Sequence, residues 1–99
     1  MENMFGTSRR IRLGIWGLGR GQAFIDLART VNIDVVAGCD WNANMREQFR
    51  RNCPDALVTD DEEQFLNCDM DAVLVSTYFF DHAEHAIRCL NQGRHVMCE

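Results

Sequence analysis

Short apolar runs alternate with helix-like segments along the chain, and this alternation constrains the fold more than any other feature. The strand-like runs, several of them rich in β-branched residues, cover residues 11–17, 33–40, 56–58, 71–77 and 95–98. The helix-like segments begin near Gly21 and then cover residues 43–52, 60–67 and 81–92. Strands that alternate with helices form parallel sheets. With right-handed crossovers, the sequence predicts an α/β, Rossmann-like, doubly wound sheet of about five strands in the order 3-2-1-4-5, with helices on both faces.

Apolar spacing and capping residues define the predicted helices more closely. Thr59, followed three residues later by Glu62, has the spacing of a capping box that opens the third helix. Gly93 stands where a left-handed residue is expected to end the last helix. We expect buried stripes at Phe24, Leu27, Ala28 and Val31 in the first helix and at Phe80, Ala83, Ile87 and Leu90 in the last.

Length and charge narrow the classes of protein that fit this chain. Its 99 residues form at most one domain, and its net charge of −5 argues against nucleic acid or an anionic membrane as a partner. No apolar stretch approaches the roughly 20 residues that a membrane helix needs. Residues 1–10 contain no apolar signal region, so we expect a flexible tail there and a cytoplasmic protein.

The cysteine, histidine and basic residues exclude several kinds of chemistry. The five cysteines, an odd number without a Cys-x-x-Cys pair, are expected to be reduced and to act as small core residues. His82 and His85 are too few ligands for a typical zinc site, so we predict no metal site. All ten basic residues are arginine, which excludes mechanisms that need a lysine of this chain. We predict no catalytic residue within these 99 residues.

A cluster of glycines follows the first predicted strand, in the stretch GLGRGQ that begins at Gly17. At a strand-to-helix turn, free backbone N–H groups and the helix dipole attract a diphosphate. Gly17 permits the tight turn, Gly19 lets a phosphate approach the backbone, and Arg20 adds a cation. Gln22 replaces the third glycine of G-x-G-x-x-G, which serves helix packing rather than phosphate contact. A glycine turn without a ligand stays open as the alternative, because this motif alone is weak.

An acidic residue ends the second predicted strand. Asp40 lies 23 residues beyond Gly17, near the spacing at which a carboxylate accepts from the ribose hydroxyls of adenosine. A carboxylate there repels a 2′-phosphate, which favours NAD over NADP. Arg46 is a cation able to reach a phosphate, so NADP stays possible. Trp41 either stacks on the adenine or shields the strand end from solvent.

Polar and aromatic residues follow the fourth predicted strand. In open α/β sheets, ligands bind beyond the carboxyl ends of the strands, where the strand order reverses. The first and fourth strands flank that point. Ser76, Thr77 and Tyr78 are therefore expected to line the cleft, and His82 falls on the first turn of the next helix. Taken alone, His82 is as well explained as an exposed or capping residue.

Three stretches together resemble the N-terminal nucleotide-binding domain of the Gfo/Idh/MocA oxidoreductases: GIWGLGRG, AGCDWN and VLVSTYFFDHAEHAIRCLNQGRHVMCE. That family typically reads Thr-Pro-x-x-x-His, then a helix that ends Ala-Leu-x-x-Gly-Lys-His-Val, and then Glu-Lys-Pro. The resemblance covers residues 11–99. The sequence departs from the pattern at Gln22, at Tyr78 in place of proline, and at Arg94 in place of lysine.

The resemblance implies where a bound dinucleotide lies. The residues that it assigns are Gly17, Leu18, Gly19, Arg20 and Gly21 for the diphosphate, Asp40 for the adenine ribose, and Thr77, Tyr78, His82 and Glu99 for the nicotinamide ribose side.

The resemblance also implies an activity, which is that of an NAD(P)-dependent, homo-oligomeric oxidoreductase acting on a secondary alcohol of a sugar, a polyol or a related compound. The lysine of Glu-Lys-Pro would follow Glu99, and the family's substrate-binding second domain is missing. We therefore expect residues 11–99 to be a dinucleotide-binding domain, incomplete at its C-terminal end, that binds cofactor without catalysing. We also expect an exposed strand edge through which the chain self-associates.

Two other classes remain compatible with the sequence. The chain is alternatively a Rossmann-type regulatory or ligand-sensing module without a catalytic role, or a structural α/β interaction domain that binds no nucleotide. A lysine directly after Glu99 in a longer protein would argue against the regulatory module. A Gly19→Val substitution that changed nothing but stability would favour the structural domain.

Overall fold

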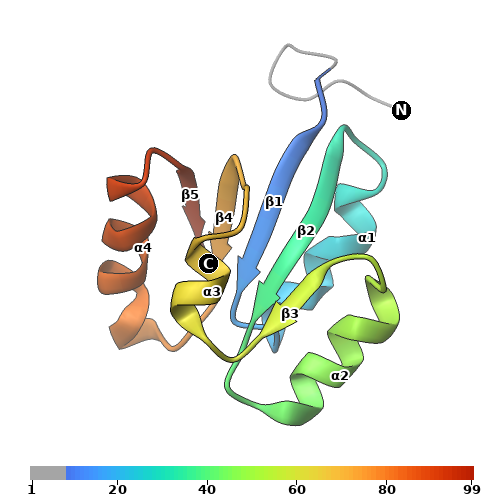
Figure 1. Cartoon of the computed structure of the whole chain (residues 1–99), viewed down its shortest axis with the longest axis horizontal. Helices are drawn as coiled ribbons and strands as arrows, with labels where there is room; N and C mark the ends of the chain where they lie inside the picture. The colour runs from blue at the N-terminus through green and yellow to red at the C-terminus, as the bar shows by residue number, and fades with distance from the viewer. Residues whose placement is uncertain (1–8) are drawn as a thin grey trace.

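The computed structural model describes residues 9–99, which form a five-stranded parallel sheet in the order β3-β2-β1-β4-β5. The strands are β1 (Ile11–Trp16), β2 (Ile33–Cys39), β3 (Leu57–Thr59), β4 (Ala72–Val75) and β5 (His95–Cys98). Figure 1 shows the strands side by side, with all arrowheads pointing the same way. The predicted doubly wound topology is confirmed, and each predicted strand lies within about two residues of the observed one.

Helices connect successive strands. They are a 3-10 helix η1 (Arg20–Phe24) that leads into α1 (Ile25–Ala28), then α2 (Ala43–Asn52), α3 (Glu62–Leu66), a 3-10 turn η2 (Phe79–Asp81) and α4 (His82–Asn91). In Figure 1, α2 lies beside β3 and α4 beside β5, at the two edges of the sheet.

Two hydrophobic clusters cover opposite faces of the sheet. Ile15 belongs to a cluster with Ile25 of α1 and Phe49 of α2, whereas its neighbour Trp16 belongs to a cluster with Phe65 of α3 and Cys89 of α4. Successive residues of a strand point to opposite faces, which explains this division. Phe49 and Phe65 are completely buried. Burying a side chain of this size stabilises the fold by about 2–3 kcal/mol.

The first helix differs from the prediction. Residues 20–24 form a 3-10 helix, and the α-helix that follows ends at Ala28, so Val31 is buried outside it, just before β2. Leu27 is 61% exposed, and Ile25 takes the buried position instead. A 3-10 helix has three residues per turn rather than 3.6, so residues spaced for one face of an α-helix no longer lie on the same face.

Helix α4 has the predicted bounds within one residue, but the predicted buried stripe is wrong. Phe80 lies in η2 and is 81% exposed, and Ile87 and Leu90 are each 56% exposed. The residues that α4 buries are His85 and Cys89. Apolar spacing identifies an apolar face of a helix, but the packing partner decides which face is covered.

Side chains cap the starts of α2 and α3, and a glycine ends α4. The Asn42 side chain accepts from two backbone N–H groups at the start of α2. The predicted capping box is wrong, because the N-cap of α3 is Asp61 and not Thr59. Thr59 is the last residue of β3, and its hydroxyl accepts from the Asp61 N–H at 2.9 Å. Gly93 has φ +77°, which confirms the left-handed end predicted for α4.

The cysteines are all free, and most are buried as expected. Cys39, Cys53 and Cys89 are buried, Cys68 is half-buried, and Cys98 is exposed. Burial, aided by nearby carboxylates that include Glu62, raises the pKa of the Cys39 thiol to about 12. The buried thiols therefore act as small apolar core residues.

A carboxylate at the start of β4 anchors β1 at the end of the sheet opposite the carboxyl ends of the strands. Asp71 accepts from the Arg12 backbone N–H at 2.9 Å and from the Arg12 guanidinium at 3.0 Å, and Arg9 pairs with it at 3.3 Å. The hydrogen bonds from Arg12 hold the pKa of the Asp71 carboxyl well below its usual range.

Of the tail predicted over residues 1–10, all but Arg9 and Arg10 lie outside the described residues.

We predict that Asp71→Asn lowers the free energy of unfolding by about 1–2 kcal/mol at pH 7, because it weakens charge-assisted hydrogen bonds to Arg12. The folded-state pKa of Asp71 lies below the unfolded value of about 3.9, so this stabilisation is complete above about pH 5. It is lost as the pH falls below about 4. Urea unfolding of both proteins at several pH values measures the difference.

Asp69→Asn is the matched control, because Asp69 also pairs with Arg12 but its side chain is 82% exposed, against 16% for Asp71. The control is expected to cost less than about 0.5 kcal/mol. Equal effects of the two substitutions, or a difference that does not change with pH, would contradict the role given to Asp71.

Candidate functional site

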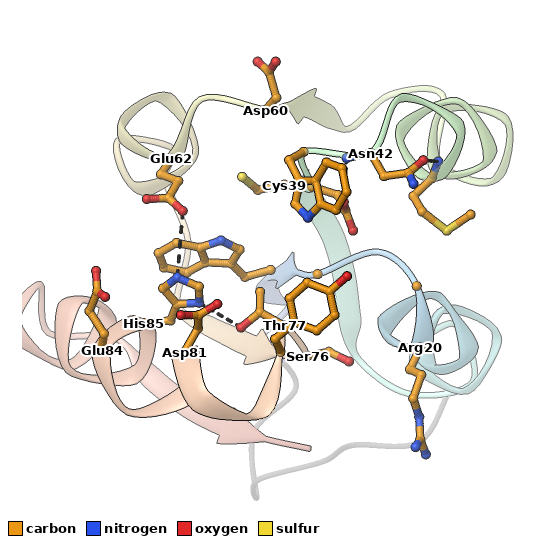
Figure 2. A pocket seen from close by; sticks show the side chains of 17 residues that line it. Arg20, Cys39, Asn42, Asp60, Glu62, Ser76, Thr77, Asp81, Glu84 and His85 are labelled. Carbon is orange, nitrogen blue, oxygen red and sulfur yellow. Dashed lines mark hydrogen bonds and ion pairs between the residues drawn. The ribbon is translucent and has the colours of Figure 1, made fainter.

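A pocket of about 580 Å³ opens at the carboxyl ends of β1, β2 and β4, where the strand order reverses. Figure 2 shows the side chains around it. Many of its lining residues are those predicted from the sequence: Gly17, Gly19, Arg20, Asp40, Trp41, Ser76, Thr77 and Tyr78.

The other predicted site residues contact this lining without being part of it. The Leu18 side chain is completely buried, and its backbone N–H donates to Asp40 at 2.8 Å. Gly21 is buried where η1 meets β1. The His82 ring bonds the Thr77 carbonyl through Nε2 at 2.6 Å. Glu99 accepts from the Ser76 hydroxyl at 3.1 Å.

Three glycines have three different structural tasks. Gly17 has φ +99°, and a Cβ there would lie 2.5 Å from the Ser76 backbone. Residues that carry a side chain rarely adopt such a backbone φ, so this position requires glycine. A Cβ at Gly21 would lie 2.5 Å from Cγ2 of Ile15, whereas a Cβ at Gly19 would meet nothing within 4 Å. Gly17 and Gly21 therefore permit close packing, and Gly19 leaves open space over the turn.

Gln22 does not fill the pocket. Its Nε2 donates to the Leu18 carbonyl at 2.8 Å, and its Oε1 accepts from Asn52 of α2 at 3.2 Å. The close approach of helix and strand that the third glycine usually permits occurs at Gly21, one residue earlier. Gly21 was the signal in the sequence, and Gln22 links the glycine turn to α2.

Asp40 stands directly after β2 with its carboxylate held in place. One oxygen accepts from the Leu18 N–H and the other from the Asn42 N–H, both at 2.8 Å. An ionised carboxylate offers about four acceptor positions, so two remain for hydroxyl groups of a ligand. The bond to Leu18 joins the end of β2 to the glycine turn after β1.

The turn between β2 and α2 uses its own polar groups internally. Arg46 donates to the carbonyls of Asp40 at 3.1 Å and Trp41 at 2.9 Å. Asn42 occupies the first free N–H groups of α2. Trp41 is 72% exposed and lines the pocket.

Arg20 pairs with a residue at the far side of the turn. Its guanidinium lies 2.6 Å from the carboxylate of Glu99, which follows β5. The Arg20 side chain is 84% exposed. Together with the Ser76–Glu99 hydrogen bond, this pair links the glycine turn, the end of β4 and the end of β5.

Sequence reasoning missed a group of residues on the α3–α4 side of the pocket. Trp16 and His85 both line it, and their rings stack with centroids 3.9 Å apart and an angle of 16°. The sequence signal was His85 itself, which we weighed only as a metal ligand. Other lining residues outside the prediction are Cys39, Asn42, Met45, Asp60, Glu62, Asp81 and Glu84.

Two features are absent from the described residues. Nowhere in residues 9–99 do three or more histidine, cysteine, aspartate or glutamate side chains come together to hold a metal ion. Within the same residues, no helix has the length and apolarity to cross a membrane.

A family model described as an oxidoreductase family with an NAD-binding Rossmann fold, GFO_IDH_MocA, matches residues 11–99. The chain belongs to this family. It is an NAD-binding Rossmann domain of the Gfo/Idh/MocA oxidoreductases, as the resemblance at Gly17, Asp40 and residues 73–99 predicts.

A curated relative and two solved structures are similar to this chain. It is 35% identical over 94 residues to 1-carboxy-3-chloro-3,4-dihydroxycyclohexa-1,5-diene dehydrogenase of Comamonas testosteroni. That match covers 90% of this chain and 23% of the relative. Apo scyllo-inositol dehydrogenase from Lactobacillus casei has 24% identity and a TM-score of 0.83 in a match that covers 93% of this chain and 29% of the enzyme's chain. The WlbA dehydrogenase of Bordetella pertussis, in complex with NADH and UDP-GlcNAcA, has 26% identity and a TM-score of 0.81. This match covers 91% of the present chain and 28% of the WlbA chain. The chain thus spans less than a third of the length of each.

The residues present fit the cofactor that the family binds. Gly19 leaves open space in which a diphosphate would fit, and Asp40 keeps acceptor positions that ribose hydroxyls would fill. No side chain of the glycine turn other than Arg20 lines the pocket, and Gln22 points toward α2.

We predict that Gly17→Ala and Gly19→Ala differ in their effect on stability. Gly17→Ala is expected to lower the free energy of unfolding by about 2–4 kcal/mol, because the methyl group meets the Ser76 backbone at a strained φ. Gly19→Ala is expected to change it by less than about 0.5 kcal/mol. Thermal and urea unfolding measure both. A Gly17→Ala variant as stable as the Gly19→Ala variant would contradict this reading of the turn.

Proposed function

We propose that this chain is the cofactor-binding part of a dehydrogenase and that it binds NAD in preference to NADP. The observation that carries the proposal is the Asp40 carboxylate, fixed at the pocket mouth by the Leu18 and Asn42 N–H groups. When bound, the nicotinamide accepts or donates a hydride. The protein residues bind and orient the cofactor on either side of the glycine turn.

The diphosphate is proposed to lie over Gly17, Leu18, Gly19 and Gly21, at the start of η1. Backbone N–H groups at such a turn bind anions, and Gly19 offers no side chain to obstruct them. Arg20 lies on the same turn, with its guanidinium on Glu99. We propose that a bound diphosphate shares this guanidinium with Glu99, which leaves Glu99 beside the nicotinamide ribose.

Three features of the β2–α2 turn support NAD over NADP. A 2′-phosphate on the adenine ribose would meet the negative charge of Asp40. The Arg46 guanidinium, the nearby cation on α2, is bound to two backbone carbonyls. Two of the free N–H groups at the start of α2, those of Asn44 and Met45, are capped by Asn42. The turn therefore has an acceptor for a ribose hydroxyl, but its cation and its capped N–H groups are already bonded and are not free to bind a phosphate.

The same geometry supports a proposal for the two ends of the cofactor. We propose that Trp41, exposed beside Asp40, stacks on the adenine ring. Ser76, Thr77 and Tyr78 line the opposite side of the pocket and face the nicotinamide half. His82, bonded to the Thr77 carbonyl, supports that side from the start of α4.

The substrate is proposed to be a secondary alcohol of a sugar, a polyol or a related ring. The name of the Comamonas relative describes a dihydroxylated cyclohexadiene, and that of the Lactobacillus enzyme describes an inositol. Both are rings that carry hydroxyl groups. Because this chain spans 23% of the first relative and 29% of the second, we propose that further protein supplies the substrate contacts. These 99 residues alone are then expected to bind cofactor and not to turn over substrate.

Isothermal titration with NAD and NADP tests the proposal. We expect NAD to bind more tightly than NADP, and Gly19→Val to weaken both without changing the melting temperature, because its side chain occupies the space of a phosphate. Absence of heat with either dinucleotide at millimolar concentration would refute cofactor binding by this chain.

We predict that Asp40→Ala lowers the affinity for NAD by about tenfold or more, because the ribose hydroxyls lose a charged acceptor. The loss for NADP is expected to be smaller, since the repulsion of its 2′-phosphate disappears as well. Asp60→Ala is the matched control, because Asp60 lines the same pocket from the β3–α3 turn but has no assigned ribose contact. An unchanged NAD-to-NADP ratio in Asp40→Ala would contradict the assignment of Asp40.

We further propose that the isolated chain self-associates through β5. This strand forms one edge of the sheet, and its Met97 side chain is 56% exposed. Open strand edges pair with other strands. Sedimentation at rising protein concentration is expected to show association that Met97→Lys weakens and Asn91→Lys, on the exposed end of α4, leaves unchanged. A chain that stays monomeric at all concentrations would contradict this proposal.

A further inference from the structure

A buried histidine lines the pocket next to Thr77, on the side assigned to the nicotinamide half. His85 is 7% exposed, although it belongs to a surface helix whose apolar residues Ile87 and Leu90 are more than half exposed. Burying a polar side chain in place of an apolar one costs free energy unless its hydrogen bonds are satisfied. The position of His85 therefore calls for a physical reason beyond filling the core.

The His85 ring is held on three sides. It stacks on Trp16 at 3.9 Å, Nδ1 lies 2.8 Å from the Thr77 hydroxyl, and Nε2 lies 3.8 Å from Glu62. Figure 2 shows these two polar contacts running from α3 through His85 to the end of β4. Arg88, one turn further along α4, donates to Glu62 at 2.8 Å and lies 5.3 Å from the Trp16 ring centre. The ring thus has little freedom to rotate.

The contact with Thr77 has consequences inside the pocket. A threonine hydroxyl has one donor and two acceptor positions, and it rotates freely unless a partner fixes it. The bond to His85 Nδ1 uses one of these positions and directs the others. Thr77 lines the pocket, and its backbone carbonyl is already bonded to His82. The hydroxyl is therefore a side-chain polar group that Thr77 offers to a ligand.

We propose that His85 is a positioning residue for the dinucleotide: through its hydrogen bond it holds the Thr77 hydroxyl in the orientation that contacts the bound cofactor. The inference rests on the proposed function, because it concerns the same pocket. It adds a residue that touches the cofactor only through another side chain. Trp16 fixes the plane of the His85 ring, and Glu62, itself held by Arg88, fixes its far edge.

A double-mutant cycle on the 99-residue chain tests the coupling. The variants are Thr77→Val, which keeps the shape but removes the hydroxyl, His85→Phe, which keeps an aromatic ring on Trp16, and the combination of the two. NADH fluorescence titration gives the dissociation constants, and circular dichroism melting gives the stabilities. Should His85→Phe fail to fold, His85→Leu takes its place, because leucine avoids overpacking and has no group that can bond the Thr77 hydroxyl.

Each single substitution is expected to weaken NADH binding by about threefold to tenfold, the effect of one lost hydrogen bond. The double variant is expected to bind no more weakly than the weaker single variant, because both substitutions remove the same contact. Thr77→Ser, which restores the hydroxyl, is expected to bind NADH within about twofold of the unchanged chain.

A merely structural role for His85 would give a different result. The two substitutions would then be coupled in the melting temperatures but not in the dissociation constants, and this outcome overturns the inference. Unchanged NADH affinity in His85→Phe, or additive effects on affinity, would overturn it as well. Failure of the unchanged chain to bind NADH would instead refute the proposed function, so the two failures are distinguishable.

Discussion

The hydrogen bond from the Leu18 N–H to the Asp40 carboxylate joins the two crossovers that form the pocket. It requires the turn after β1 to pass close to the end of β2, and Gly17 allows this because no side chain meets the Ser76 backbone. Asp40 and Gly19 thus line the same pocket. The shape of the turn and the placing of the charge therefore have one origin. Any change that relaxes the turn also moves the carboxylate.

The opposite side of the pocket combines apolar packing around Trp16 with the polar contacts of His85. Trp16 ends β1 beneath the pocket, and His85 covers it from α4. Because this face of α4 is given to His85 and Cys89, the apolar residues of the helix, such as Ile87, lie outward. The helix thus contributes to the pocket through a polar contact with Thr77 and leaves an apolar surface beside β5.

Much of the site was predictable, for reasons that can be stated residue by residue. The glycine turn and Asp40 were found because parallel strands must deliver their carboxyl ends to one edge of the sheet. Gln22 was an apparent defect in the motif, and the neighbouring Gly21 supplies the close packing. His85 was not found, because Trp16, on which its ring stacks, is distant in sequence.

The sequence by itself determined the order of elements, the parallel sheet and the edge at which the pocket-lining residues meet. Hydrophobic periodicity and glycine positions act locally, and crossover handedness then leaves few topologies. Only the tertiary structure decided that Arg20 pairs with Glu99, that Arg46 holds the β2–α2 turn, and that α4 buries His85. These contacts depend on which side chains lie close enough to bond one another once the chain is folded. The spacing of residues along the sequence does not give those distances.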